Sequence, residues 1–108
     1  MKKSMNIFWA AVARQDLSEI IKFISKDSPD NARIILNKIK IKTAELNKLP
    51  NLGCVVPELL QQGISTYQEI IVKPWRGMYR IEGKSVYIVS VIDSRRNMED
   101  ILLARLLR

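Results

Sequence analysis

The apolar and polar positions alternate most clearly over residues 67–96, where they predict an antiparallel sheet. Runs rich in Ile, Val, Tyr and Trp favour extended backbone, because branched and aromatic side chains pack well on a pleated surface. Gly83 separates the second and third runs and can adopt the positive φ of a tight turn, so residues 78–82 are expected to pair with residues 85–93. Pro74 lacks an amide hydrogen and marks a turn between the first two runs. The result is a predicted meander of three strands.

The alternation also assigns side chains to the two faces of this meander. Met78 and Arg80 fall on one face, while Tyr79 and Ile81 fall on the other, because successive strand side chains point in opposite directions. One face is therefore expected to be core and the other cationic.

The N-terminal pattern predicts a strand and then a helix. Met5, Ile7 and Trp9 occupy alternate positions, which indicates a strand with one face fully buried and the other, carrying Asn6 and Phe8, partly buried. The period changes at about residue 10 to that of an amphipathic helix, which is expected to run to about residue 26. Its apolar positions are Val12, Leu17, Ile20, Ile21 and Ile24.

A second helix begins at Ser28-Pro29-Asp30, the clearest local signal in the chain. Ser28 can accept a hydrogen bond as the N-cap, proline suits the first turn, and an acidic residue suits the positive end of the helix dipole. The apolar stripe continues through Leu46 and Leu49, so the helix is expected to end just before Pro50. Its lysines can form a nucleic-acid surface, but a lysine-rich outer helix face is more often simply solvated.

The remaining segments complete an α+β order. Residues 51–63 predict a loop with one short apolar turn, and Asn97 can cap a C-terminal helix over residues 98–107. The expected fold is a strand, a helical hairpin, an antiparallel three-strand meander and a C-terminal helix, in one domain over residues 1–108.

Composition and charge narrow the class of partner. The chain has 108 residues, is 47% hydrophobic and carries a formal charge of +7, with +5 on residues 1–50, −2 on residues 51–72 and +4 on residues 73–108. Such a charge favours nucleic acid, the ribosome, an anionic membrane surface or an acidic protein, without choosing among them. The basic, apolar N-terminus imitates a short signal peptide, but Asn6 interrupts the run and the pattern continues into a helix.

Cysteine and histidine usage excludes several kinds of site. Cys54 is the only cysteine and there is no histidine, so neither an intrachain disulfide nor a zinc site is expected. No cofactor-binding motif, phosphate loop or nucleophile elbow is present. Ser94 and Cys54 are available nucleophiles without a base partner that the sequence reveals, which favours structural roles for both. A reducing cytoplasm and no membrane segment are expected.

The remaining candidate chemistry is a group of arginines and tyrosines on the meander and at its exit. Arg76, Arg95 and Arg96 can clamp phosphates, and Tyr79 or Tyr87 can stack on a base or donate a proton. In the alternative interpretation the tyrosines pack in the core or at an edge, and the arginines pair with nearby carboxylates. Those carboxylates are Glu69, Glu82 and Asp93. Both interpretations stay open for the tyrosines, and the structural one is favoured for Arg80.

Five motifs, in this order and spacing, give the chain a family resemblance. They are A-x-x-D-L-x-x-I-x-x-F-I at residues 13–24, S-P-D-N-A at 28–32, L-P-N-L-G-x-x-x-P-E-L at 49–59, P-W-R-x-x-Y-R-I at 74–81 and V-x-V-I-D-S-R-R at 89–96. Together they resemble the RelE/ParE superfamily of bacterial type II toxins. The resemblance implies a helical hairpin packed on a twisted antiparallel sheet, in agreement with the order of elements above.

The resemblance also implies two kinds of partner. Members of the superfamily are neutralised by a small antitoxin whose disordered segment folds as it wraps the toxin, in a hetero-oligomer that contacts DNA only through the antitoxin. A basic toxin favours an acidic wrapping partner. The second partner is the cellular target: RelE-like members cut mRNA in the ribosomal A site, and ParE-like members inhibit DNA gyrase.

Residue-by-residue comparison favours the ParE-like branch. Arg76 and Arg95 match positions where the nuclease branch has phosphate-contacting arginines, but Gln68 and Ile70 stand where that branch tends to have lysines, and Ile101 stands near its tyrosine. The histidine that other nuclease members carry near the Asp93 position is also absent from this sequence. The sequence therefore predicts a growth-inhibiting, plasmid-stabilisation type of toxin that binds gyrase. Its candidate target-binding residues are Arg76, Arg95, Arg96 and Tyr79. The alternatives are a ribosome-dependent nuclease that uses Arg76, Arg95 and Tyr79 for catalysis, and a degenerate toxin that only binds its antitoxin.

Overall fold

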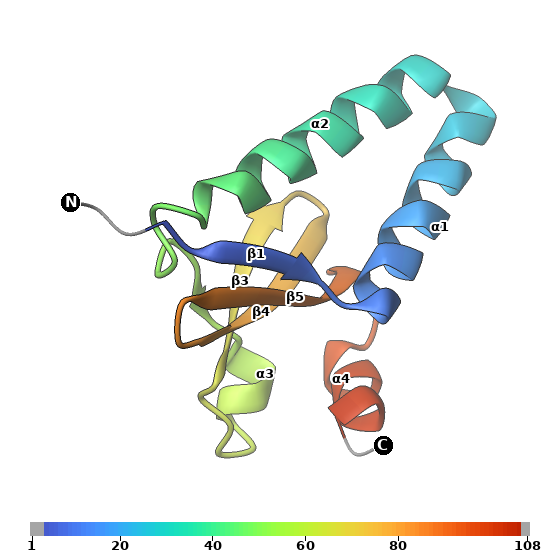
Figure 1. Ribbon diagram of the computed structural model, residues 1–108. Helices are drawn as coiled ribbons and strands as arrows, with labels where there is room; N and C mark the ends of the chain where they lie inside the picture. The colour runs from blue at the N-terminus through green and yellow to red at the C-terminus, as the bar shows by residue number, and fades with distance from the viewer. Residues whose placement is uncertain (1–3, 107–108) are drawn as a thin grey trace.

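The fold is a five-stranded sheet with a pair of helices on each face (Figure 1). A computed structural model describes residues 4–106 of the chain. Its elements, in chain order, are β1 (Asn6–Trp9), α1 (Ala11–Asp27), α2 (Pro29–Glu45), β2 (Cys54–Val55), α3 (Pro57–Leu60), β3 (Tyr67–Val72), β4 (Trp75–Glu82), β5 (Ser85–Asp93) and α4 (Met98–Leu106). None of the helices within residues 4–106 combines the length and apolarity needed to cross a bilayer.

The predicted meander forms the centre of this sheet. The strand order is β1-β5-β4-β3-β2, and β3, β4 and β5 are consecutive antiparallel neighbours. Gly83 has a φ of 59° in the tight turn between β4 and β5, and Pro74 lies in the turn between β3 and β4, both as predicted. β1 pairs with β5 in parallel, which the order of elements alone did not reveal. The β4–β5 hairpin, which comes late in the chain, therefore lies beside the first strand.

β1 is an edge strand, and this corrects the expectation that one of its faces is fully buried. Ile7 and Trp9 are half-buried on the side of the helices, while Asn6 and Phe8 are exposed on the other side. An edge strand has a neighbour on one side only, so its side chains have fewer atoms to pack against than those of a central strand.

The helical hairpin begins as predicted but ends earlier. Ser28 Oγ accepts a hydrogen bond from the amide of Asn31 at 3.1 Å and caps α2. α2 ends at Glu45 rather than just before Pro50, because residues 46–48 form tight turns that place Leu46 in the core and leave Leu49 exposed. The expected loop over residues 51–63 also contains more structure than predicted, namely β2 and the single turn of α3.

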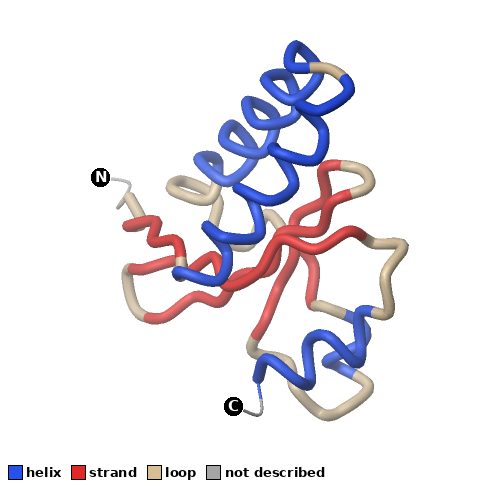
Figure 2. The backbone as a smooth tube through the Cα atoms, turned by 90° about the vertical axis from the view of Figure 1, so that its right-hand side faces the viewer, coloured by secondary structure: helices blue, strands red, loops and turns tan. Residues whose placement is uncertain are grey.

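Two hydrophobic clusters lie on opposite faces of the sheet, so the expectation of one core face and one cationic face is wrong. Tyr79, Ile88 and Trp75 belong to the cluster under the α1–α2 hairpin. Met78 and Ile92 belong to the cluster under α3 and α4. Figure 2 shows these two helix layers on either side of the strands. Both faces of β5 contribute to a core because helices cover both sides of the sheet, and the β4–β5 register is interrupted between Met78 and Tyr79.

Candidate functional site

Arg76, one of the predicted target-binding residues, is inside the protein. Its side chain rises from β4 towards α3 and is only 8% exposed. Its Nη1 and Nη2 each donate to one oxygen of Glu58 at 2.7 Å, and its Nε donates to both oxygens of Glu69 at 3.1 and 3.0 Å. Nη2 also contacts Glu69. The guanidinium therefore fastens α3 to β3 and β4, and its hydrogen-bonding fork has no free side for a phosphate.

The electrostatics of this cluster agree with its geometry. The hydrogen bonds from Arg76 hold the pKa of the Glu58 carboxyl below its ordinary value, against the opposing effect of burial. Glu58 and Glu69 in turn raise the pKa of Arg76. The two carboxylates therefore offset the charge of the arginine in place of an external anion.

Tyr79, the second predicted contact, is fully buried. Its hydroxyl lies 2.8 Å from both the carbonyl oxygen of Pro50 and the side-chain oxygen of Gln68, and it accepts the Gly53 amide at 3.0 Å. Burial raises the pKa of Tyr79. A Cβ atom on Gly53 would stand 2.2 Å from the Glu69 carbonyl oxygen, so only glycine allows this approach. Tyr79 therefore anchors the segment after α2 through contacts within the protein, and its contact with a target stays a prediction.

Arg95 and Arg96 differ from these two residues because they lie on the surface, just after β5. Arg95 is 73% exposed in its side chain and donates from Nε to Asp93 at 2.9 Å. This contact lowers the pKa of Asp93 to about 2. Arg96 forms no ion pair within residues 4–106. Both arginines remain candidates for contact with another molecule.

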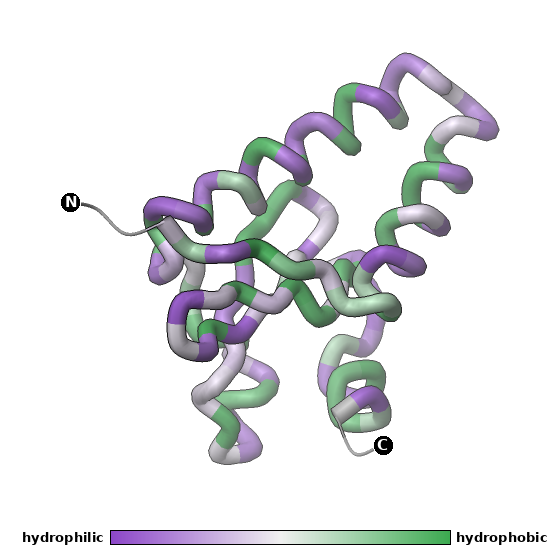
Figure 3. The backbone as a smooth tube through the Cα atoms, viewed as in Figure 1, coloured by the Kyte–Doolittle hydropathy of each residue, from purple (hydrophilic) through white to green (hydrophobic). Residues whose placement is uncertain are grey.

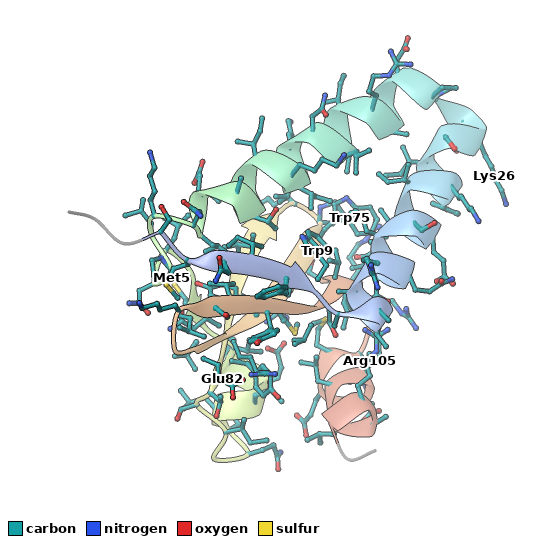
Figure 4. The ribbon with its side chains drawn as sticks, viewed as in Figure 1. Met5, Trp9, Lys26, Trp75, Glu82 and Arg105 are labelled. Carbon is teal, nitrogen blue, oxygen red and sulfur yellow. The ribbon has the colours of Figure 1, made fainter. Side chains whose placement is uncertain are left out.

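A surface groove of about 460 Å³ connects these arginines to α1. It is lined by Asp16, Glu19, Ile20, Phe23, Trp75, Val91, Asp93, Arg95 and Arg96. Phe23 on α1 is largely exposed, and the buried Trp75 Nε1 has no hydrogen-bond partner among the described residues. In Figure 4, Trp75 lies between the sheet and the helical hairpin, together with Trp9. The groove offers aromatic, cationic and anionic groups, a mixture suited to a protein surface.

The structure separates the predicted arginines instead of gathering them. Trp75 is the β4 residue opposite Asp93, and Arg76, one position further, points to the other face. Arg76 and Arg95 therefore do not converge on one ligand. The carboxylate pairing considered as the alternative from the sequence is present for Arg76, Arg80 and Arg95, which pair with Glu69, Glu82 and Asp93 respectively. Arg95 nevertheless stays exposed, and Arg96 forms no ion pair among the described residues.

Tyr87 packs at the exposed end of the sheet. The Arg80 guanidinium carbon lies 4.4 Å from the centre of its ring, and the Phe8 ring stacks on it with centroids 5.4 Å apart. Because Tyr67 is opposite Arg80 in the register, these four side chains form a row across β3, β4, β5 and β1. Tyr87 therefore has the structural role of packing between neighbouring strands, although β5 is not an edge strand.

The positions that would serve a nuclease carry no groups able to transfer a proton. Gln68 bonds to Tyr79 and to Asn51, Ile70 is buried in the core under the hairpin, and Ile101 packs in the second core. Ser94 and Cys54 are exposed, and neither has a hydrogen bond to a basic side chain within the described chain. No group of three potential metal ligands occurs among residues 4–106.

Three residues that form ion pairs in the structure were not identified from the sequence: Glu58, Asp16 and Arg105. Glu58 belongs to the P-E-L motif, but nothing in its spacing shows that the turn of α3 aims it at Arg76. Asp16 and Arg105 bind each other although 89 positions separate them. The sequence does contain a weak indication that α2 exposes apolar side chains. Ile34 and Ile41 are seven positions apart, so they share one side of the helix, and this side differs from the buried stripe that contains Ala32 and Ile39.

Comparisons with known proteins agree with this architecture. The chain has the fold of a toxin–antitoxin structure described as the chromosomal ParDE system from P. aeruginosa, with a TM-score of 0.67 and 19% identity over 84% of this chain and 97% of that one. It also has the fold of a chain in the RelBE2 toxin–antitoxin complex from Mycobacterium tuberculosis, with a TM-score of 0.57 and 19% identity over 86% of this chain and 94% of that one.

Sequence comparisons identify the branch. Toxin ParE3 of Caulobacter vibrioides is 32% identical over a match that covers 57% of this chain and 68% of that toxin. The model of the family described as the ParE toxin of the type II toxin-antitoxin system parDE matches residues 7–98. The predicted resemblance is confirmed, and with it the preference for the ParE-like side. This chain therefore belongs to the ParE toxin family of type II toxin–antitoxin systems.

Proposed function

We propose that this toxin arrests growth by binding DNA gyrase, and that a small acidic antitoxin in the same cytoplasm holds it inactive in a hetero-oligomer. In this proposal the toxin is a binding inhibitor and not a nuclease. Its target contact is made by Arg95 and Arg96 at the exit of β5, with the groove that Phe23 borders.

The observation that carries the proposal is the internal neutralisation of Arg76. A ribosome-dependent cut needs cations that stabilise the phosphate and groups that activate the 2′-hydroxyl. Here the arginine in the phosphate-contacting position is held by Glu58 and Glu69, and the two neighbouring β3 positions carry Gln68 and Ile70. Inhibition by contact requires none of these groups, only a surface that is accessible to a macromolecule.

The groove at the exit of β5 supports contact with a protein target. Exposed arginines next to an exposed aromatic residue are the side chains that most often dominate binding at protein interfaces. Arg95, Arg96 and Phe23 provide both types within one surface. A phosphate-binding cleft would favour cations alone, whereas Asp16, Glu19 and Asp93 also line this groove.

Assays with purified toxin distinguish DNA gyrase from the ribosome as its target. With DNA gyrase and relaxed plasmid, we expect toxin to lower the rate of supercoiling in proportion to its concentration. With ribosomes and a defined mRNA, we expect no cuts positioned at the A-site codon. Codon-positioned cleavage together with unaffected supercoiling would replace the proposal with a nuclease function.

The proposed antitoxin is tested in the same preparations. The product of a short reading frame adjacent to or overlapping the toxin gene, purified separately, is expected to restore supercoiling at a stoichiometric ratio. If this product is acidic and disordered alone, circular dichroism will show a gain of ordered structure on mixing. A neighbouring product that binds without restoring supercoiling would contradict the neutralising role.

A further inference from the structure

A second groove, distinct from the one at Arg95, lies between α2 and the tip of the β3–β4 hairpin. It has a volume of about 410 Å³ and is lined by lysines and branched aliphatic residues. The principal members of this lysine–isoleucine groove are Lys38, Lys42, Lys73, Ile35, Ile41 and Ile71. Figure 1 shows the hairpin tip beneath α2, so the helix and the hairpin form its two sides.

Two of the three isoleucines of the lysine–isoleucine groove are largely exposed, while Ile35 is half-buried against the core under the hairpin. Ile41 is 63% exposed and Ile71 is 53% exposed, although the protein buries other isoleucines in both of its cores. Figure 3 shows hydrophobic positions alternating with hydrophilic ones along the whole of α2. A cluster of large apolar side chains at a concave surface gains free energy when a partner covers it, because water then leaves that area.

The lysines of the lysine–isoleucine groove form no ion pair within residues 4–106. No acidic residue lines the groove, and the five salt bridges among the described residues all use arginine. Lys38 and Lys42 are four residues apart on α2, about 6 Å along the helix axis at a rise of 1.5 Å per residue. The groove therefore presents two cations one helical turn apart, a third on the hairpin and an apolar surface between them.

We propose that the lysine–isoleucine groove docks an acidic, amphipathic segment of the antitoxin, with carboxylates one helical turn apart and aliphatic side chains between them. The groove's lysines favour carboxylates in the antitoxin segment by charge complementarity, and its exposed isoleucines favour apolar side chains in that segment. Single-stranded nucleic acid fits less well, because no aromatic residue is available to stack on bases. This inference rests on the proposed neutralisation by an antitoxin, and it assigns that partner a surface separate from Arg95 and Arg96.

A charge-reversal variant with a matched control tests the proposal. Lys38→Glu/Lys42→Glu reverses both α2 cations. Lys22→Glu/Lys26→Glu reverses two exposed lysines with the same spacing on α1, and Lys26 lies near the far end of the hairpin from the sheet (Figure 4). The binding probe is a synthetic amphipathic peptide of leucine and glutamate with glutamates at i and i+4. A peptide with lysine in place of glutamate serves as its counterpart.

We expect wild-type toxin to bind the glutamate peptide and not the lysine peptide. Lys38→Glu/Lys42→Glu should weaken that binding about a hundredfold, and Lys22→Glu/Lys26→Glu less than about threefold. Ile41→Ser should weaken it about tenfold, since it removes apolar contact without a change of charge. Equal loss in both double variants would show non-specific attraction to a basic protein and would overturn the proposal.

Cell growth separates a failure here from a failure of the proposed function. We expect Lys38→Glu/Lys42→Glu to arrest growth like wild type, and to escape rescue by the coexpressed product of the adjacent reading frame. The groove assignment would be overturned if the adjacent reading frame's product rescued cells that express Lys38→Glu/Lys42→Glu as it rescues wild type. It would also be overturned if this variant lost growth arrest but still bound that product as wild type does. Binding to phosphatidylglycerol vesicles in place of the peptide would assign the groove to a membrane surface instead. A wild-type chain that fails to arrest growth contradicts the proposed function, while the peptide measurement still decides the groove.

Discussion

Arg105 on α4 binds Asp16 on α1 through both ends of its guanidinium group, with Nη1 2.8 Å from Oδ2 and Nη2 2.9 Å from Oδ1. Oδ2 of Asp16 also accepts a hydrogen bond from the Val91 amide at 3.0 Å, and Nη1 of Arg105 donates a second hydrogen bond to Ser90 Oγ. In Figure 4, Arg105 lies beside the start of α1. This pair joins the two helix layers around the end of the sheet.

Asp16→Ala is expected to lower the free energy of unfolding by about 2–4 kcal/mol, because it leaves the Val91 amide and a partly buried guanidinium without their acceptor. Urea titration followed by tryptophan fluorescence measures this loss. Glu19→Ala, an exposed change on the same helix, should cost less than about 0.5 kcal/mol. Additive effects of Asp16→Ala and Arg105→Ala in a double-mutant cycle would show that the two residues do not interact.

Arg76→Ala is expected to destabilise the fold by about 3–5 kcal/mol, since it leaves the buried Glu69 carboxylate without its counter-charge. An effect of this size would contradict the assumption, natural from sequence, that this is a surface arginine whose loss affects only toxicity. Glu69→Leu/Arg76→Leu should cost less than Arg76→Ala alone, because the buried Glu69 charge is removed together with its partner and only the more exposed Glu58 carboxylate is left unpaired. Chemical denaturation of the three proteins gives the ranking, and a stable Arg76→Ala protein would refute the structural role.

Tyr79→Phe is expected to lower the free energy of unfolding by about 1–2 kcal/mol and to leave growth arrest intact. The substitution keeps the buried ring but removes the hydroxyl that holds Pro50, Gly53 and Gln68. Thermal unfolding and a plate assay of growth on induction measure the two quantities. Loss of arrest with an unchanged unfolding temperature would instead restore Tyr79 as a functional side chain.

The contact between Asp93 and Arg95 predicts that the stability of the fold depends on pH under acidic conditions. Its pKa falls from an ordinary 3.8 to about 2 because Arg95 donates hydrogen bonds to the carboxylate. A carboxyl whose pKa is lower in the folded state stabilises the protein above its unfolded pKa, and this stabilisation is lost as pH falls from about 4 to about 2. Asp93→Asn should flatten the decline of the unfolding temperature across this window. Because the pair is at the surface, added salt should weaken the effect.

Arg95→Ala/Arg96→Ala is expected to raise the toxin concentration needed for half-inhibition of gyrase by at least about tenfold, with only a small decrease in unfolding temperature, because the lost Arg95–Asp93 pair lies at the surface. Arg33→Ala, an exposed arginine on α2, serves as the control and should behave like wild type. Inhibition unaffected by the double substitution would remove the exit of β5 from the target-binding surface.

Sequence periodicity predicted the elements that are determined locally. The N-cap at Ser28, the turn at Gly83 and the meander all follow from residues within a few positions of one another, and the structure contains all three. The early end of α2 was not predictable in the same way. Leu46 and Leu49 both fit the helical stripe, and only the tertiary position of Leu46 in the core decides between a helix and a turn.

The candidate site was less predictable, because charge in a sequence does not show where it is neutralised. Arg76 and Arg95 look alike along the chain, yet one is buried between Glu58 and Glu69 and the other is exposed beside Asp93. Glu58 could be recognised as a partner only after α3 had been placed against β4. The surface lysines show the reverse case: a face interpreted as simply solvated borders exposed isoleucines that the sheet hairpin brings to it.

The parallel pairing of β1 with β5 has a consequence for how a cell makes this protein. Asn6 is opposite Ser85, so the first strand cannot find its neighbour until most of the polypeptide has left the ribosome. Nascent fragments that stop before this point would carry the α1–α2 hairpin but lack both β5, which joins β1 to β4, and α4. The sheet, and with it the surface at the exit of β5, can therefore be completed only after β5 has been synthesised.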